Sequence, residues 1–331
     1  MKRLLVTLAT AALLTGCSLP ASVTGEKTGD AKDPARTAPA ISNDGVPPAQ
    51  GSGGAQLPGD ASSLASMAQQ LASQQPTAVA STTGPGDLPP GTYGGDISWP
   101  QCPPGMGIPQ KRSTGQPMPL PDATFIVIGL TNGPGFVRNP CLRTQVQWAK
   151  IHQLKVSAYS VLSYPSDADL TKYGATGPYP TNTVIGRLKN VGYAQATYNV
   201  GSMGASGLDT PIVWLDVESV PGFDWPKNNA EDNGAIVQGA VRGYKDAGYG
   251  VGVYGTPTIW RGIVGALSLG ADVPEWRAAG QTSAGEAASR CSASWTIQGG
   301  RAVMGQWVEK RRDRNLICPG VAGLDAWFHQ A

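Results

Sequence analysis

Two spacings of apolar residues alternate from about position 93 to the end of the chain. Short apolar runs rich in β-branched residues predict strands, and apolar residues at helical spacing between them predict helices. The predicted strands cover residues 95–98, 123–130, 155–162, 211–219, 250–255, 273–279 and 301–308. The predicted helices cover residues 142–153, 181–198, 231–247 and 258–269. This alternation predicts an α/β fold, and about 240 residues suit a single TIM-like (β/α) barrel.

The first 17 residues have the pattern of an export signal. Met1-Lys-Arg is followed by the apolar run 4–14, which is shorter than an ordinary membrane-spanning helix. The run ends in Leu14-Thr-Gly-Cys17, which resembles the lipobox of bacterial lipoproteins. The resemblance implies cleavage before Cys17, lipid on that cysteine and a protein anchored to the cell membrane on its extracytoplasmic side. A plain signal peptide that contains a cysteine is the alternative.

Residues 18–90 differ in composition from the rest of the chain. No aromatic residue occurs before Tyr93, and Ala, Ser, Gly, Pro, Gln and Thr dominate. Such a segment buries too little apolar surface to offset the entropy of ordering it. We therefore predict a disordered linker over 18–90 and a barrel domain over 91–331.

The cysteine count fits an exported protein. Five cysteines are present, and lipid on Cys17 leaves four that can pair in an oxidising compartment. Of the three connectivities, we favour Cys102–Cys141 and Cys291–Cys318, because the partners of each pair are near in sequence. A four-cysteine zinc site is disfavoured because no C-x-x-C spacing occurs.

Charge, histidine content and glycine placement argue against several classes of binding and catalytic site. A formal net charge of +2 gives no reason to expect nucleic acid. His152 and His329 are the only histidines, and neither falls in a predicted strand-end loop, which argues against Ser-His-Asp, Cys-His and histidine-rich metal sites. The glycines of Gly250-Val-Gly-Val-Tyr-Gly255 lie within a predicted strand rather than after it, so a dinucleotide site is rejected. We expect no metal or cofactor, and we interpret the basic run 310–314 as a solvated loop.

Acidic residues are the remaining candidates for chemistry. Asp216 and Glu218 follow the buried run Ile212-Val-Trp-Leu215, and residues two apart on a strand share a face. Acids forced together raise the pKa of one of them, which suits general-acid catalysis; the alternative is a capping Asp and a surface Glu. Because the first and last strands of a barrel are neighbours, Asp96 and Asp325 are expected at the same mouth. Aromatic side chains pack on sugar rings, and the candidates for substrate binding are Trp99, Tyr159, Trp225, Tyr254 and Trp307.

Several short segments together resemble glycoside hydrolase family 25, the lysozymes of the Chalaropsis type. They are Asp96-Ile-Ser98, Phe125-Ile-Val-Ile128, Val156-Ser-Ala-Tyr159, Leu215-Asp-Val-Glu218, Gly252-Val-Tyr254, Gln306-Trp307 and Gly323-Leu-Asp325. The resemblance implies an irregular (β/α) barrel that cleaves peptidoglycan after N-acetylmuramic acid. Glu218 would be the general acid, Asp216 would assist by holding the acetamido group, and Asp96 and Asp325 would complete the site.

The chain also departs from that pattern. The first strand is followed by Trp99-Pro100-Gln101, the third strand ends Tyr159-Ser160-Val161, and the segments 103–121 and 282–300 are insertions. These differences affect the expected substrate contacts more than the acids. We therefore predict a membrane-anchored, monomeric lysozyme-type glycosidase that acts on peptidoglycan. The alternatives are a catalytically inactive glycan-binding or envelope-organising lipoprotein on the same barrel and a hydrolase of another glycan.

Overall fold

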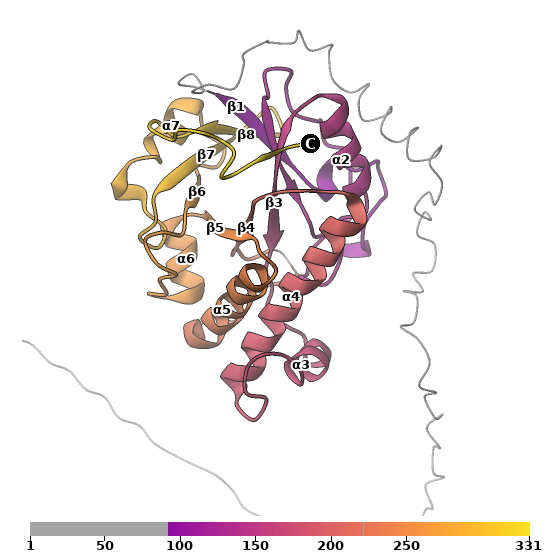
Figure 1. The fold of residues 1–331 in the computed structure, drawn as a ribbon, viewed down its shortest axis with the longest axis vertical. Helices are drawn as coiled ribbons and strands as arrows, with labels where there is room; N and C mark the ends of the chain where they lie inside the picture. The colour runs from indigo at the N-terminus through magenta and orange to yellow at the C-terminus, as the bar shows by residue number, and fades with distance from the viewer. Residues whose placement is uncertain (1–91, 221) are drawn as a thin grey trace, which may run out of the picture. The chain divides into compact units, whose positions relative to one another are not determined.

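The computed structural model describes residues 92–220 and 222–331. The predicted signal peptide, the lipidated Cys17 and the predicted linker over 18–90 lie outside these residues. Figure 1 shows the described part as a ring of strands with helices on its outside. Within it, no helix is both long and apolar enough to cross a membrane.

Eight strands close into a barrel, which confirms the predicted barrel and adds one strand to the seven predicted. They follow the order β2-β1-β8-β7-β6-β5-β4-β3, and β2 also pairs with β3. Their bounds are β1 Tyr93–Ile97, β2 Phe125–Gly129, β3 Lys155–Val161, β4 Ile212–Asp216, β5 Gly250–Gly255, β6 Glu275–Ala278, β7 Ala302–Glu309 and β8 Arg312–Ile317. Neighbouring strands from β1 to β7 run parallel, whereas β8 runs antiparallel to both β7 and β1. The barrel is irregular for that reason. Its mouth is the end that holds the carboxyl ends of β1–β7 and the start of β8.

Helices cover the outer face of the barrel. They are α2 Leu142–Ile151, α3 Asp167–Gly174, α4 Val184–Ser206, α5 Ala230–Asp246, α6 Pro257–Val264 and α7 Ala284–Ser289, with short 3₁₀ turns at Trp99–Gln101, Pro109–Lys111 and Ala293–Trp295. The long helices α4 and α5 lie side by side (Figure 1). Local sequence sets both ends of α4. The Thr183 hydroxyl accepts a hydrogen bond from the Gly186 amide at its start, and Gly207 ends the helix with a φ of 67°. The sequence did not predict α3, α7 or β8.

Alternation along the strands separates two apolar cores. Outward residues such as Ile126, Val213 and Leu215 pack under the helices, while inward residues such as Trp214 and Trp276 fill the barrel. An inward glycine makes room for one indole, because a Cβ on Gly252 would lie 2.3 Å from the Trp214 ring. The interior of the barrel is thus packed with side chains.

The C-terminal segment covers the end of the barrel opposite the mouth. The strand β9 (His329–Gln330) pairs antiparallel with the first residues of β3. The Phe328 ring is fully buried and lies 4.8 Å from the Phe125 ring, centroid to centroid. The chain therefore leaves β8 and passes to the amino-terminal end of the parallel strands, away from the mouth.

A buried ion pair organises most of the 282–300 insertion. Glu275 and Arg277 lie on β6, and their charged atoms approach to 2.7 Å with both side chains buried. The Glu275 carboxylate also accepts hydrogen bonds from the loop, whose donors are Thr296 Oγ1 and the amides of Ile297, Gln298 and Gly300. The Arg277 guanidinium donates to three loop carbonyls, those of Arg290, Ser292 and Gly300. Because the charged atoms of both side chains are hydrogen-bonded, the Glu275–Arg277 pair holds the loop against the barrel.

Candidate active site

Asp96, near the end of β1, is buried at the mouth and held by two amide side chains. Its Oδ2 accepts hydrogen bonds from Gln306 Nε2 at 3.0 Å and from Asn315 Nδ2 at 2.8 Å. The amide oxygens are occupied in turn, by the Tyr254 hydroxyl on Gln306 and by the Trp276 indole N–H on Asn315. Since an indole can only donate, the Asn315 amide must turn its NH₂ group toward Asp96. This network holds Asp96 as an acceptor of hydrogen bonds.

Asp216 and Glu218 lie at the same mouth, as predicted from their spacing. Asp216 ends β4 and is 3% exposed, and no described residue donates a hydrogen bond to its Oδ1. Burial raises the pKa of Asp216 well above its ordinary value, with further increases from the charges of Glu218 and Asp96. Glu218 is partly exposed, and its pKa is raised by burial and by the charge of Asp313.

Asp313, which the sequence analysis did not identify, is the fourth acid at this mouth. It lies on β8, where its Cα pairs with that of Asp96. Burial raises the pKa of Asp313 to about 6. Residues 310–314 were interpreted as a solvated loop, which is wrong for the last three of them, because β8 begins at Arg312.

The four acids surround one small cavity of about 160 Å³. Its lining consists of Asp96, Tyr159, Asp216, Glu218, Tyr254, Trp276, Gln306 and Asp313. The pKa values of both tyrosines are raised, first by burial and then by the nearby carboxylates, so their hydroxyls stay protonated. For Tyr159 the ring also needs Gly129, whose added Cβ would lie 2.7 Å from it. The cavity therefore combines acids that hold protons at mild pH with aromatic surface.

A larger hollow of about 420 Å³ lies elsewhere, beside the 290–300 loop. It is lined by Arg277, Arg301 and mostly small residues, including Gly299 and Gly300, and no carboxylate borders it. Acid–base chemistry therefore belongs to the smaller cavity. Among residues 92–220 and 222–331, no group of three or more His, Cys, Asp or Glu side chains is arranged to hold a metal ion.

The prediction that Asp325 shares the mouth is wrong. Its side chain is 88% exposed and forms an ion pair of 2.7 Å with Lys155, the first residue of β3. That contact lowers the pKa of Asp325 and places the residue at the opposite end of the barrel. The physical reason is that β8 closes the barrel, while the segment containing Asp325 runs beneath it.

The predicted aromatic residues fall in different places. Tyr159 and Tyr254 line the cavity, whereas Trp99 is partly exposed in the 3₁₀ turn after β1 and does not line it. Trp225 is buried, and its indole N–H donates to the Glu218 carbonyl at 3.1 Å, so it supports the backbone of the acid. The prediction that Trp307 binds substrate is wrong.

Trp307 faces away from the cavity. Its neighbour Gln306 points inward to Asp96, and adjacent residues of a strand point to opposite faces. The Trp307 ring packs against Tyr93 at 5.9 Å and against residues of α7 on the outer surface. The inward tryptophan at the cavity is Trp276, which the sequence analysis did not single out.

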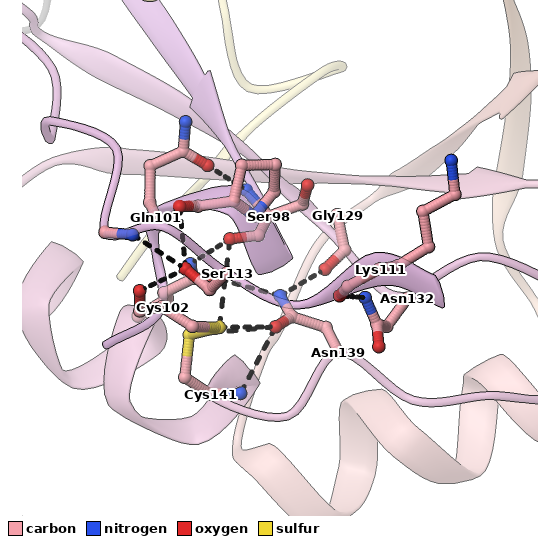
Figure 2. The surroundings of a disulfide bond; sticks show 12 residues. Ser98, Gln101, Cys102, Lys111, Ser113, Gly129, Asn132, Asn139 and Cys141 are labelled. Carbon is pink, nitrogen blue, oxygen red and sulfur yellow. Dashed lines mark hydrogen bonds between the residues drawn. A yellow bond between two sulfur atoms is a disulfide. The ribbon is translucent and has the colours of Figure 1, made fainter. Parts of the chain in front are cut away.

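Both predicted disulfides, Cys102–Cys141 and Cys291–Cys318, are confirmed. The first fixes the loop after β1 to the start of α2, as Figure 2 shows. Asn139 reinforces this junction, with its Nδ2 donating to the Gly129 carbonyl at 2.8 Å (Figure 2). The loop that carries Trp99 is therefore anchored beside the mouth.

Comparison with known proteins gives a partial sequence match and loose structural overlaps. No family model matches the chain. A probable GH family 25 lysozyme 5 of Dictyostelium discoideum is 38% identical over 71 residues, which are 21% of this chain and 32% of that protein. The match thus spans about a third of the relative's length.

Two solved structures overlap with the barrel. The autolysin LytC of Streptococcus pneumoniae, in complex with a synthetic peptidoglycan ligand, has a TM-score of 0.40 at 12% identity, covering 68% of this chain and 46% of LytC. A muramidase from Trichobolus zukalii has a TM-score of 0.41 at 18% identity, covering 70% of this chain and 95% of the muramidase. Both scores are below 0.5, so the two structures overlap with this barrel only loosely. Over those 71 residues the chain is similar to a lysozyme of glycoside hydrolase family 25, and its described part forms a closed β/α barrel.

Proposed function

We propose that the protein hydrolyses the glycan strands of peptidoglycan by acid catalysis, as a lysozyme-type glycosidase. The observation that carries the proposal is the convergence of four buried or partly buried carboxyl groups on one cavity lined by tyrosine and tryptophan. Glycosidic bonds are cleaved by pairs of carboxyl groups, one of which must hold a proton near neutral pH. The name of the Dictyostelium relative agrees with this chemistry.

Glu218 is the proposed proton donor. Its pKa is raised by burial and by Asp313, and no described residue donates a hydrogen bond to its carboxylate. Asp96 accepts two N–H donors, which only partly offset the burial that raises its pKa well above the ordinary value. Glu218 is preferred as the donor because its side chain is partly exposed and can reach a substrate oxygen, whereas Asp96 is buried behind its two amide partners. Glu218 protonates the leaving oxygen as its bond to the sugar breaks, Asp313, charged above about pH 6, stabilises the positive charge that develops on the sugar, and water adds to that sugar.

Asp216 is proposed to hold the substrate. A buried carboxylate oxygen without a donor is costly, and its Oδ1 is such an atom among the described residues. The N–H of an acetamido group on the sugar supplies the missing hydrogen bond. Tyr159, Tyr254 and Trp276 provide the surface against which the sugar ring packs.

Release of reducing ends from purified peptidoglycan tests the proposal. Wild-type protein is expected to release them, and Glu218→Gln is expected to lose about 100-fold or more in rate, the usual contribution of a general acid. Asp325→Asn is the matched control, because it removes an acid far from the cavity. If neither wild type nor variant releases ends while both bind wall material, the protein is a glycan-binding module.

We further propose that lipid on Cys17 anchors the protein to the outer side of the cell membrane and that it acts as a monomer. Two disulfides in the barrel support an extracytoplasmic location, since such bonds persist in oxidising compartments. Incorporation of labelled palmitate by wild type and not by Cys17→Ser tests the anchor. Sedimentation of the purified protein tests the monomer.

A further inference from the structure

The turn between β7 and β8 has a backbone that does not suit its residues. Glu309 pairs with Arg312, so Lys310 and Arg311 alone form the turn. Their φ angles are 50° and 63°, which places both in the left-handed region. A two-residue hairpin turn of this kind favours Asn-Gly, because a Cβ there lies too close to a carbonyl oxygen, a cost that glycine avoids and that Asn offsets by local hydrogen bonds. Two of the four non-glycine residues with positive φ in the described chain are therefore adjacent basic residues at this tip.

The turn lies at the mouth of the barrel. β7 ends there and β8 begins there, because β8 runs antiparallel to its neighbours. Arg311 precedes the cavity residue Asp313 by two positions, with Arg312 alone between them. The tip thus stands beside the site proposed to hold the sugar.

The side chains of Lys310 and Arg311 are exposed to solvent, while the start of β8 next to them is fixed by a hydrogen bond. The Lys310 side chain is 79% exposed, and its Nζ lies 3.9 Å from a Glu309 oxygen. Arg311 is exposed and has no ion-pair partner among residues 92–220 and 222–331. Beneath them, Arg312 Nε donates to the Met118 carbonyl at 2.8 Å, which fixes the start of β8 to the neighbouring loop. Strain kept at an exposed, well-anchored tip is typical of functional positions.

We propose that Lys310 and Arg311 bind the carboxylates of the peptide stems carried by the glycan strand in the cavity. This inference rests on the proposed function and adds a substrate contact to it. A stem attached to the bound sugar extends by about 3.3–3.6 Å per residue, so a few residues carry its carboxylates from the cavity to the tip. The four acids of the cavity repel such carboxylates, and the two cations offset that repulsion where the stem leaves the cavity.

The variant Lys310→Asn/Arg311→Gly, made in the full chain, separates binding from folding. It introduces the residues that the turn favours, so its unfolding midpoint in urea should equal or exceed that of wild type. The control is Lys150→Gln/Lys245→Gln, which removes two exposed positive charges at the ends of α2 and α5 away from the mouth. Both variants carry the same reduction in positive charge.

KM is measured on soluble peptidoglycan fragments with intact stems and on glycan strands from which the stems were removed. For the turn variant we expect KM to rise about three- to tenfold on intact fragments, as for the loss of two surface ion pairs, and to stay unchanged on peptide-free strands. The control should match wild type on both substrates. An unchanged KM on intact fragments, or an equal rise on both substrates, overturns the inference.

Failure of the proposed function gives a different result. If wild type cleaves peptide-free strands, the glycosidase proposal stands whatever the turn variant does. If wild type cleaves nothing, the same comparison is made by the binding constant of the Glu218→Gln protein, with and without the turn substitutions, for fragments with and without stems. Equal binding constants with and without the turn substitutions for stem-bearing fragments then overturn the inference directly.

Discussion

Neutralising Asp313 is expected to stabilise the barrel at neutral pH. The side chain is largely buried, accepts no hydrogen bond from the described residues and has a folded-state pKa of about 6 against an ordinary value of 3.8. That interval of about two pH units corresponds to about 3 kcal/mol of unfolding free energy. Asp313→Asn keeps the shape of the side chain and removes the charge. For a domain of this size the gain equals a rise in Tm of roughly 6–12 °C.

The pH dependence follows from the direction of the shift. Below about pH 3.8 the carboxyl is protonated in both the folded and the unfolded state, so it costs nothing. Between pH 3.8 and about 6 the unfolded chain releases the proton while the folded protein keeps it, and wild-type stability falls. Above about pH 6 the penalty is constant. The advantage of Asp313→Asn should therefore be absent near pH 3.5 and complete at pH 7.5.

Urea unfolding with the disulfides intact, at pH 3.5, 5 and 7.5, measures this difference. Asp325→Asn is the control, because that acid is exposed and its pKa is lowered by Lys155. Its substitution should slightly weaken the fold at neutral pH, which is the opposite sign. Equal stability of Asp313→Asn and wild type at pH 7.5 would refute the reasoning. So would a stabilisation of the same size at pH 3.5, since it could not arise from the charge.

Three further substitutions test other parts of the structure. Arg277→Met leaves the buried Glu275 charge without its partner and should lower the unfolding free energy, measured in urea, by about 3–5 kcal/mol. A loss below about 1 kcal/mol would contradict the role of the Glu275–Arg277 pair in holding the loop against the barrel. Gly252→Ala places a methyl group against the Trp214 ring and should lower the unfolding free energy by about 1–3 kcal/mol in the same measurement. Wild-type stability of this variant would contradict the close packing of Trp214 on Gly252. Trp307→Phe should leave KM on peptidoglycan unchanged, because the ring packs on the outer face, and a severalfold rise in KM would contradict that placement.

Much of the barrel was predictable because its strands are apolar on both faces. The predicted strand at 250–255 coincides with β5, and the other predicted strands and helices overlap observed ones. β8 was missed because its first four residues, 312–315, are all polar. Its arginines face outward while Asp313 and Asn315 face the cavity, so no apolar alternation marks the strand.

The candidate site was predictable where spacing, or the end of a predicted strand as for Asp96, sets the direction of the side chain. Asp216 and Glu218 lie two apart after a buried run, and that spacing brings both to the cavity. For Trp307 the spacing allows either face, and the choice depends on the inward hydrogen bond of Gln306. Asp325 was misplaced because an aspartate near the end of the chain was assigned to the closing strand, a position that tertiary structure gives to Asp313.

The identity of the sugar at the newly formed reducing end tests the central claim most directly. Peptidoglycan digested with wild-type protein is reduced with borohydride, hydrolysed and analysed for amino-sugar alcohols. Cleavage after N-acetylmuramic acid with Glu218 as the acid predicts muramitol from the wild-type digest and none above background from Glu218→Gln. Glucosaminitol in place of muramitol, or muramitol from both proteins alike, would contradict the account.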